Sequence, residues 1–195
     1  MLPDDAAWLA QRVYWDLTRA SRAEVESAVK EYSGPVLLSP HHLPQAAAGR
    51  VAAVAGFPTG RHHSLVKATE ARLAVQNGAA EIWVAVDATL NDPNALLTDL
   101  VTVREACPDP VVLGVILPAA DVAPAAPDLV VDMAEKAGYQ RVIIRGDQEG
   151  PETADSCLER ILWAETALDI GQQIDALEEG YVAVATSFNQ FVCFM

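Results

Sequence analysis

The stretch that decides the fold class runs from residue 51 to residue 86 and reads VAAVAGFPTGRHHSLVKATEARLAVQNGAAEIWVAV. It opens with a continuous apolar run at 51–55, which is typical of a strand covered on both faces. A Gly-Phe-Pro-Thr-Gly turn follows at 56–60, and residues 65–76 then have the composition of a helix that stops at an Asn-Gly pair. A second apolar run at 82–86 completes a strand–helix–strand unit. This unit predicts two parallel strands joined by a right-handed crossover.

The same alternation of short apolar runs and helical stretches continues through the rest of the chain. Because repeated βα units imply a parallel sheet and a generous count gives eight strands, we predict an α/β fold, a (β/α)₈ TIM barrel. The alternative is an open doubly wound sheet, but no G-x-G-x-x-G follows the first strand. We expect a single barrel domain over residues 1–195, shortened at its C-terminal end. The predicted strands are 13–17, 36–38, 51–55, 82–86, 111–117, 142–144, 167–170 and 182–185, and the predicted helices are 22–31, 65–76, 128–137, 153–163 and 174–179.

Composition and charge exclude several classes of function. The chain has 195 residues, of which 13 are basic and 27 acidic, so its formal net charge is −14. Such an acidic chain is unsuited to nucleic acid or to an anionic membrane surface, both of which attract clustered Lys and Arg. No apolar run is long enough to span a bilayer, and the N-terminus lacks the layout of a signal peptide, so we expect a cytoplasmic protein. The three cysteines have neither disulfide-framework nor zinc-site spacing, and no cofactor is predicted.

The turn at 56–60 and the residues that follow it resemble a motif of the deoxyribose-phosphate aldolases. That family has G-F-P-x-G after its third strand, K-x-x-E on a helix and G-A-x-E-I on the next strand. The corresponding residues here are the turn itself, Lys67 with Glu70, and residues 78–82. Weaker similarity extends from residue 13 to residue 187. The resemblance implies a class I aldolase, a carbon–carbon lyase, with its site at the C-terminal ends of the barrel strands.

The catalytic residues of that family are not all matched. Its Schiff-base lysine belongs where Ile143 stands, its second functional lysine has no counterpart, and Trp83 replaces its acid/base aspartate. A Schiff base needs a neutral amine, so isoleucine cannot act in its place. Of only three lysines in the chain, Lys67 alone is expected near the site, and we interpret it as a solvated structural lysine. Asp16, Lys67 and Asp87 remain the candidate catalytic residues.

The histidines fall just after the second and third predicted strands, at His41, His42, His62 and His63. Adjacent strand-end loops would bring the two pairs together, and Asp16 and Asp87 could join them in a zinc or iron site that activates water. The alternative interpretation is that the histidines are exposed loop residues and that some of them cap helix starts.

Two arginines and two hydroxyl residues are candidates for binding a phosphate or carboxylate group: Arg61, Arg145, Thr186 and Ser187. Arg145 is the basic residue at the end of the sixth predicted strand and can bind such an anion bidentately. The alternative is a salt bridge to one of the many acidic residues. Thr186 and Ser187 resemble the family's phosphate loop, and Trp83 is expected to pack inside the barrel mouth.

We therefore interpret the chain as a divergent aldolase-like pseudoenzyme that binds a small phosphorylated or carboxylated ligand without Schiff-base chemistry. Three alternatives stay open: an active aldolase, a metal-assisted enzyme that uses the His and Asp residues, and a structural interaction protein. The apolar tail at 188–195 is too short to cover the last strand and its neighbour, which predicts a homodimer. Alternatively, the helical-looking segment 3–12 covers that gap.

Overall fold

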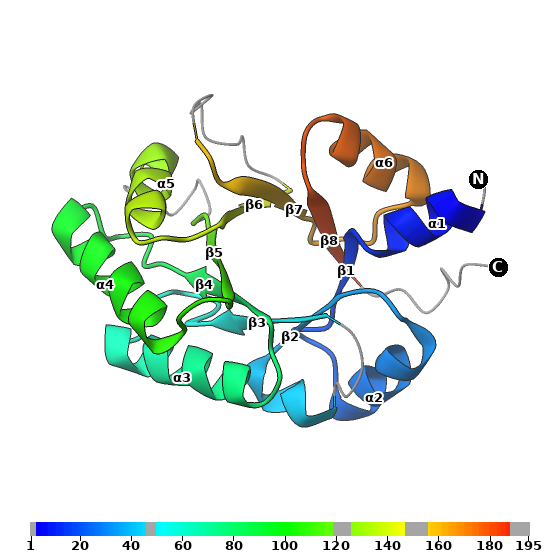
Figure 1. Ribbon diagram of the computed structural model, residues 1–195, viewed down its shortest axis with the longest axis horizontal. Helices are drawn as coiled ribbons and strands as arrows, with labels where there is room; N and C mark the ends of the chain where they lie inside the picture. Colours follow the sequence, from blue (N-terminus) through cyan, green and yellow to red (C-terminus); the bar gives the residue numbers. More distant parts are fainter. Residues whose placement is uncertain (1–2, 46–49, 119–125, 147–155, 188–195) are drawn as a thin grey trace.

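Eight parallel strands close into a barrel in the computed structural model (Figure 1). The structure describes residues 3–45, 50–118, 126–146 and 156–187. Strands that are neighbours in the sequence are neighbours in the sheet, and the first strand pairs with the eighth to close the barrel. This arrangement confirms the predicted fold. The strands are β1 (Val13–Asp16), β2 (Val36–Leu38), β3 (Val51–Ala55), β4 (Glu81–Ala85), β5 (Val112–Ile116), β6 (Arg141–Arg145), β7 (Glu159–Trp163) and β8 (Ala183–Ser187).

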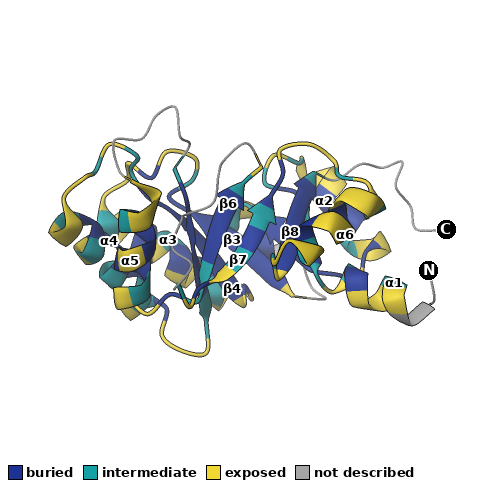
Figure 2. Cartoon of the chain, turned by 90° about the horizontal axis from the view of Figure 1, so that it is seen from above, coloured by how far each residue is buried: buried dark blue, intermediate teal, exposed yellow. Residues whose placement is uncertain are grey.

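Helices cover the outside of the barrel, with their buried faces on the strands and their exposed faces outward (Figure 2). Among the described residues, none of them is both long enough and apolar enough to cross a membrane. The helix after Ser21 begins with a capping box: the Ser21 hydroxyl accepts from the backbone N–H of Glu24, whose carboxylate accepts from the backbone N–H of Ser21. The helices are α1 (Pro3–Ala10), α2 (Arg22–Glu31), the 3₁₀ helix η1 (Pro40–Gln45), α3 (Ser64–Gln76), α4 (Pro93–Ala106), α5 (Pro127–Lys136) and α6 (Ile170–Glu178).

The seventh strand differs from its prediction. The sequence predicts a helix over 153–163 and a short strand at 167–170, whereas β7 is formed by Glu159–Trp163, and α6 begins at Ile170. β7 pairs with β6 along its whole length, and its alternate residues Ile161 and Trp163 are buried inside the barrel. Their two-residue period is that of a strand, and pairing with both neighbours outweighs the local helical pattern.

Two further points concern a helix that was not predicted and the residues at the two ends of the chain. Helix α4 is not among the predicted helices, although Asp92 caps its first turn and Pro93 occupies its first position, both of which are ordinary start signals. The expected shortening after β8 falls on residues 188–195, which lie outside the described residues. The segment expected to cover the neighbouring gap forms α1, where Leu9 is buried and Trp8 is half exposed.

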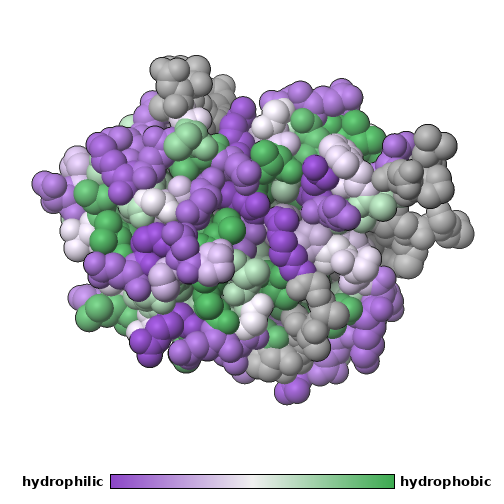
Figure 3. All heavy atoms as spheres, viewed as in Figure 1, coloured by the Kyte–Doolittle hydropathy of each residue, from purple (hydrophilic) through white to green (hydrophobic). Residues whose placement is uncertain are grey.

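The core has two parts, one between strands and helices and one inside the barrel. The interior cluster combines three large aromatic residues, Tyr14, Trp83 and Trp163, with branched aliphatic and alanine side chains. A filled interior of this kind is a packed core and not a channel. On the outside, Figure 3 shows hydrophilic side chains in purple gathered over the middle of the barrel on the face turned to the viewer.

Candidate active site at the mouth of the barrel

The turn at 56–60 connects the end of β3 to α3 and is fixed by two side chains of that helix. The backbone N–H of Gly56 donates to Glu70 at 2.7 Å, and the Lys67 ammonium donates to the carbonyl of Gly60 at 2.9 Å. Gly60 has a φ of +68°, and a Cβ there would lie 2.1 Å from the backbone of Val86. Only glycine fits this position, so the K-x-x-E pair and the glycines together hold the turn against β4.

Lys67 is buried, with 1% of its surface exposed, so the expectation of a solvated side chain was wrong while that of a structural one stands. Besides Gly60, its ammonium donates to the carbonyl of Ala85 at 3.2 Å and to Oδ2 of Asp99 at 2.5 Å. An ammonium group has three N–H donors, and here each has an acceptor. Lys67 lies in the layer between the strands and the helices α3 and α4, outside the barrel interior.

Aromatic rings fill the barrel axis below the mouth. The Trp163 ring lies 5.2 Å from that of Phe57 and 5.6 Å from that of Trp83, measured between centroids. Trp83 is completely buried and donates from its indole nitrogen to Oε1 of Glu81 at 2.6 Å. Trp83 therefore packs as expected, but it lies deeper than the mouth. Ile143, also completely buried, lies in the same interior cluster.

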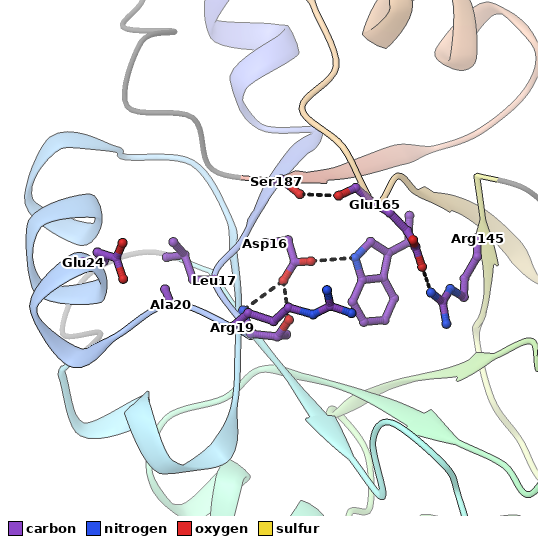
Figure 4. Close-up of a pocket in the computed structure, with 10 residues that line it drawn as sticks. Asp16, Leu17, Arg19, Ala20, Glu24, Arg145, Glu165 and Ser187 are labelled. Carbon is purple, nitrogen blue, oxygen red and sulfur yellow. Dashed lines mark hydrogen bonds and ion pairs between the residues drawn. The ribbon is translucent and has the colours of Figure 1, made fainter.

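A cavity of about 230 Å³ opens at the mouth beside this aromatic column, between the ends of β1, β7 and β8. Asp16 lies at its floor (Figure 4): one carboxylate oxygen accepts from the backbone and hydroxyl of Thr18, and the other accepts from the Trp163 indole at 2.8 Å. Arg19, Arg145 and Glu165 line its walls. The cavity thus has charged walls and one carboxylate held in a fixed orientation.

Three of the four proposed anion-binding residues, Arg145, Thr186 and Ser187, contact the loop after β7. Arg145 forms an ion pair with Glu165, which agrees with the alternative interpretation of a salt bridge to one of the acidic residues. The Ser187 hydroxyl donates to the carbonyl of Glu165 at 2.8 Å. Thr186 is buried, donates to the carbonyl of Thr166 and accepts from the N–H of Leu168 at 2.8 Å. These two hydroxyls therefore fix the loop that positions Glu165.

Asp87 and Arg61 lie on the other side of the mouth, and Asp87 accepts from Arg61 at 3.4 Å. Partial burial alone would raise the pKa of Asp87, but hydrogen bonds from the Thr89 backbone and hydroxyl and the charge of Arg61 hold it below its ordinary value. A second cavity, of about 270 Å³, contains Arg61, Phe57 and Arg145. Arg145 therefore contacts both mouth cavities, which Phe57 and Trp163 separate.

The histidines do not assemble a metal site in the described part of the chain, where no three His, Cys, Asp or Glu side chains form a metal-binding group. His63 caps α3 by accepting from the N–H of Leu65 at 3.2 Å, which is the alternative role expected for a loop histidine. The rings of His41 and His42 lie 5.2 Å apart. Asp16 and Asp87 accept hydrogen bonds from other partners, as described above.

Sequence reasoning missed Trp163 and Glu165 as residues of the mouth. The assignment of 153–163 to a helix places Trp163 on an outer surface, and it leaves Glu165 in a loop that follows a helix and not a barrel strand. The signal that could have found them is the alternation of Ile161 and Trp163 at the point where a seventh strand is required to close the barrel.

Part of the sequence is similar to known aldolases, although no family model matches the chain. It is 49% identical over 119 residues to a deoxyribose-phosphate aldolase of Corynebacterium jeikeium (52% of this chain, 48% of the relative) and 50% identical over 107 residues to one of Nocardia farcinica (53% and 48%). The match therefore spans about half the length of these curated relatives. The solved deoxyribose-phosphate aldolase of Aeropyrum pernix has the same fold, with a TM-score of 0.73, 22% identity and coverage of 92% of this chain and 86% of that one.

The closed barrel defines the class of protein as a (β/α)₈ TIM barrel. Within that class, about half of the chain is similar in sequence to deoxyribose-phosphate aldolases, the family that the residues around Gly56 resemble.

Proposed function

We propose that this protein is an aldolase-like barrel that binds a small phosphorylated or carboxylated ligand at its mouth and forms no Schiff base. The positions of the three lysines carry this proposal. Lys30 and Lys136 lie in the last turns of α2 and α5, and helix ends of this kind lie at the barrel face opposite the mouth. Lys67 is buried outside the barrel interior and paired with Asp99.

The environment of Lys67 opposes nucleophilic chemistry. A lysine nucleophile must be neutral, which is achieved by desolvation or by a neighbouring cation. Lys67 instead forms an ion pair with the Asp99 carboxylate at 2.5 Å, and its three N–H groups already donate to Asp99, Gly60 and Ala85. The rings of Phe57, Trp83 and Trp163 in addition occupy the space through which a substrate would reach Ile143.

The ligand class follows from the walls of the 230 Å³ cavity. The Arg19 and Arg145 guanidinium groups can donate paired hydrogen bonds to a phosphate or carboxylate group. Glu165 holds Arg145 in position through their ion pair. A ligand must compete with the Glu165 carboxylate for Arg145, so binding requires that this ion pair opens.

A second candidate, favoured by the names of the relatives, is an active aldolase that cleaves or forms a carbon–carbon bond of a deoxyribose phosphate-like substrate. The two candidates predict opposite outcomes of imine trapping. Purified protein would be treated with sodium borohydride in the presence of acetaldehyde or 2-deoxyribose 5-phosphate and then digested for mass spectrometry. We expect every lysine-containing peptide to keep its unmodified mass. A reduced adduct on Lys67 that is absent from Lys67→Met would establish the second candidate and overturn the first.

A further inference from the structure

The N-terminal face of the barrel, opposite the mouth, has a cavity of about 420 Å³ that the proposed function does not use. Three arginines line it, and all come from the starts of strands: Arg12 precedes β1, Arg50 precedes β3 and Arg141 is the first residue of β6. Glu159, the first residue of β7, is the carboxylate among its described lining residues. Guanidinium groups therefore outnumber carboxylates at this point of a chain whose net charge is −14.

Arg141 is held in place by a buried glutamate behind the cavity. Its Nη1 lies 2.6 Å from both carboxylate oxygens of Glu81, and its Nε donates to Glu159 at 3.0 Å. Glu81 is 1% exposed and accepts further hydrogen bonds from Tyr14 and Trp83. Because the carboxylate is anchored from several sides, the guanidinium that faces the cavity is preorganised.

Arg50 lies beside this pair with donors to spare. Its guanidinium lies 5.1 Å from the centre of the Tyr14 ring, and its contacts with Tyr14 and Glu81 both use Nη2. Within the part of the chain that the structure describes, its Nε–H and Nη1–H groups have no protein acceptor. Burial lowers the pKa of Arg50; Glu81 opposes this effect, and the nearby charge of Arg141 adds to it. An anion bound in this cavity would offset the repulsion between the Arg50 and Arg141 charges.

Helix α1 supplies the aromatic wall beside the third arginine. The Arg12 guanidinium lies 4.2 Å from the centre of the Trp8 ring and donates to the Trp8 carbonyl at 3.2 Å. Tyr181 forms another part of the lining. The cavity therefore combines cationic groups at its floor with flat apolar surfaces at its rim.

We propose that this cavity is a second ligand site and binds a phosphate group, with Arg50 and Arg141 on the oxygens and Trp8 beside any organic part. Planar guanidinium groups suit phosphate because each can donate two parallel hydrogen bonds to it. Free phosphate and a phosphate monoester share this chemistry. The aromatic rim favours the monoester, so a comparison of inorganic phosphate with phenyl phosphate separates the two sources.

Isothermal titration calorimetry with both probes tests the site in the full-length chain, with Arg50→Ala on this face and Arg145→Ala at the mouth as its matched control. We expect Arg50→Ala to weaken the binding of either probe at one site by at least about tenfold, as for a lost charge-assisted hydrogen bond. Arg145→Ala should leave that site unchanged, and the part of the binding-induced fluorescence change that Trp8→Phe removes should be kept in Arg145→Ala and lost in Arg50→Ala.

Arg50→Gln keeps the test decisive if Arg50→Ala does not fold, because it removes the same guanidinium and retains a side chain of similar bulk. Wild-type titration curves that are unaffected by both variants, or that only Arg145→Ala changes, would overturn the proposal. Either result leaves the ligand site proposed at the mouth to stand or fall separately.

Discussion

The ammonium group of Lys67 lies 2.5 Å from Oδ2 of Asp99, and both side chains are almost completely removed from solvent. The pair joins α3 to α4 directly beneath the turn at 56–60, whose Gly60 carbonyl accepts from the same ammonium. One ion pair thus connects two helices, a strand end and a loop of the mouth.

Removal of one partner of this pair should destabilise the fold. Lys67→Met leaves the Asp99 carboxylate buried without its cation, and such a change costs roughly 3–5 kcal/mol of unfolding free energy. Urea denaturation measures it. The double variant Lys67→Met with Asp99→Leu should recover most of the loss, since it buries no charge. A single variant as stable as wild type would show that the pair contributes little.

Glu165 should weaken anion binding at the mouth, because it occupies Arg145 in the unliganded protein. Glu165→Gln is therefore expected to tighten the binding of a small anion there. Arg145→Ala is expected to weaken it by roughly 1.5–3 kcal/mol. Titration calorimetry of both variants with a small anion measures these two changes in affinity. If neither change alters the affinity, the anion does not bind at the mouth.

Stability should fall at alkaline pH through two buried phenols. Burial raises the pKa of Tyr32 and of Tyr139 above the ordinary value of 10.0. A raised folded-state pKa means that the unfolded chain loses its protons first, so this stabilisation is complete below about pH 10 and is lost as pH rises further. Urea midpoints at about pH 8 and about pH 11 measure the loss, and Tyr32→Phe should show a smaller drop than wild type. An equal drop in both would exclude Tyr32 as a source.

We predict that the protein forms a homodimer through the surface near β1 and β8. Helix α1 already buries Leu9, so it covers part of the region for which a dimer is predicted. Light scattering at tens of micromolar protein gives the mass directly. A dimer would agree with an apolar surface shared between copies, whereas a monomer whose tail resists protease would favour cover from within the chain.

The strands could be predicted wherever both faces of a strand are buried, as in 51–55 and 142–144, because a short continuous apolar run with β-branched residues is typical of a covered parallel strand. β7 could not, since Glu159 and Arg160 give it a polar start and its pairing partners come from elsewhere in the chain. The mouth position of Asp16 followed from the end of β1. The burial of Lys67 was not predicted, because its partner Asp99 belongs to α4, which is missing from the prediction although its start signals are ordinary.

The aromatic column of Phe57, Trp83 and Trp163 also bears on how this barrel can evolve. An ionisable side chain that arises at Ile143 by a single substitution would enter a completely buried, packed interior, where an ionised group is costly to bury. It would gain access to a ligand only after at least one ring had become smaller, and each such step alone leaves a void that destabilises the protein. Neither order of changes is neutral. The aromatic column therefore makes it difficult for single substitutions to restore an ionisable residue and an open cavity inside the barrel.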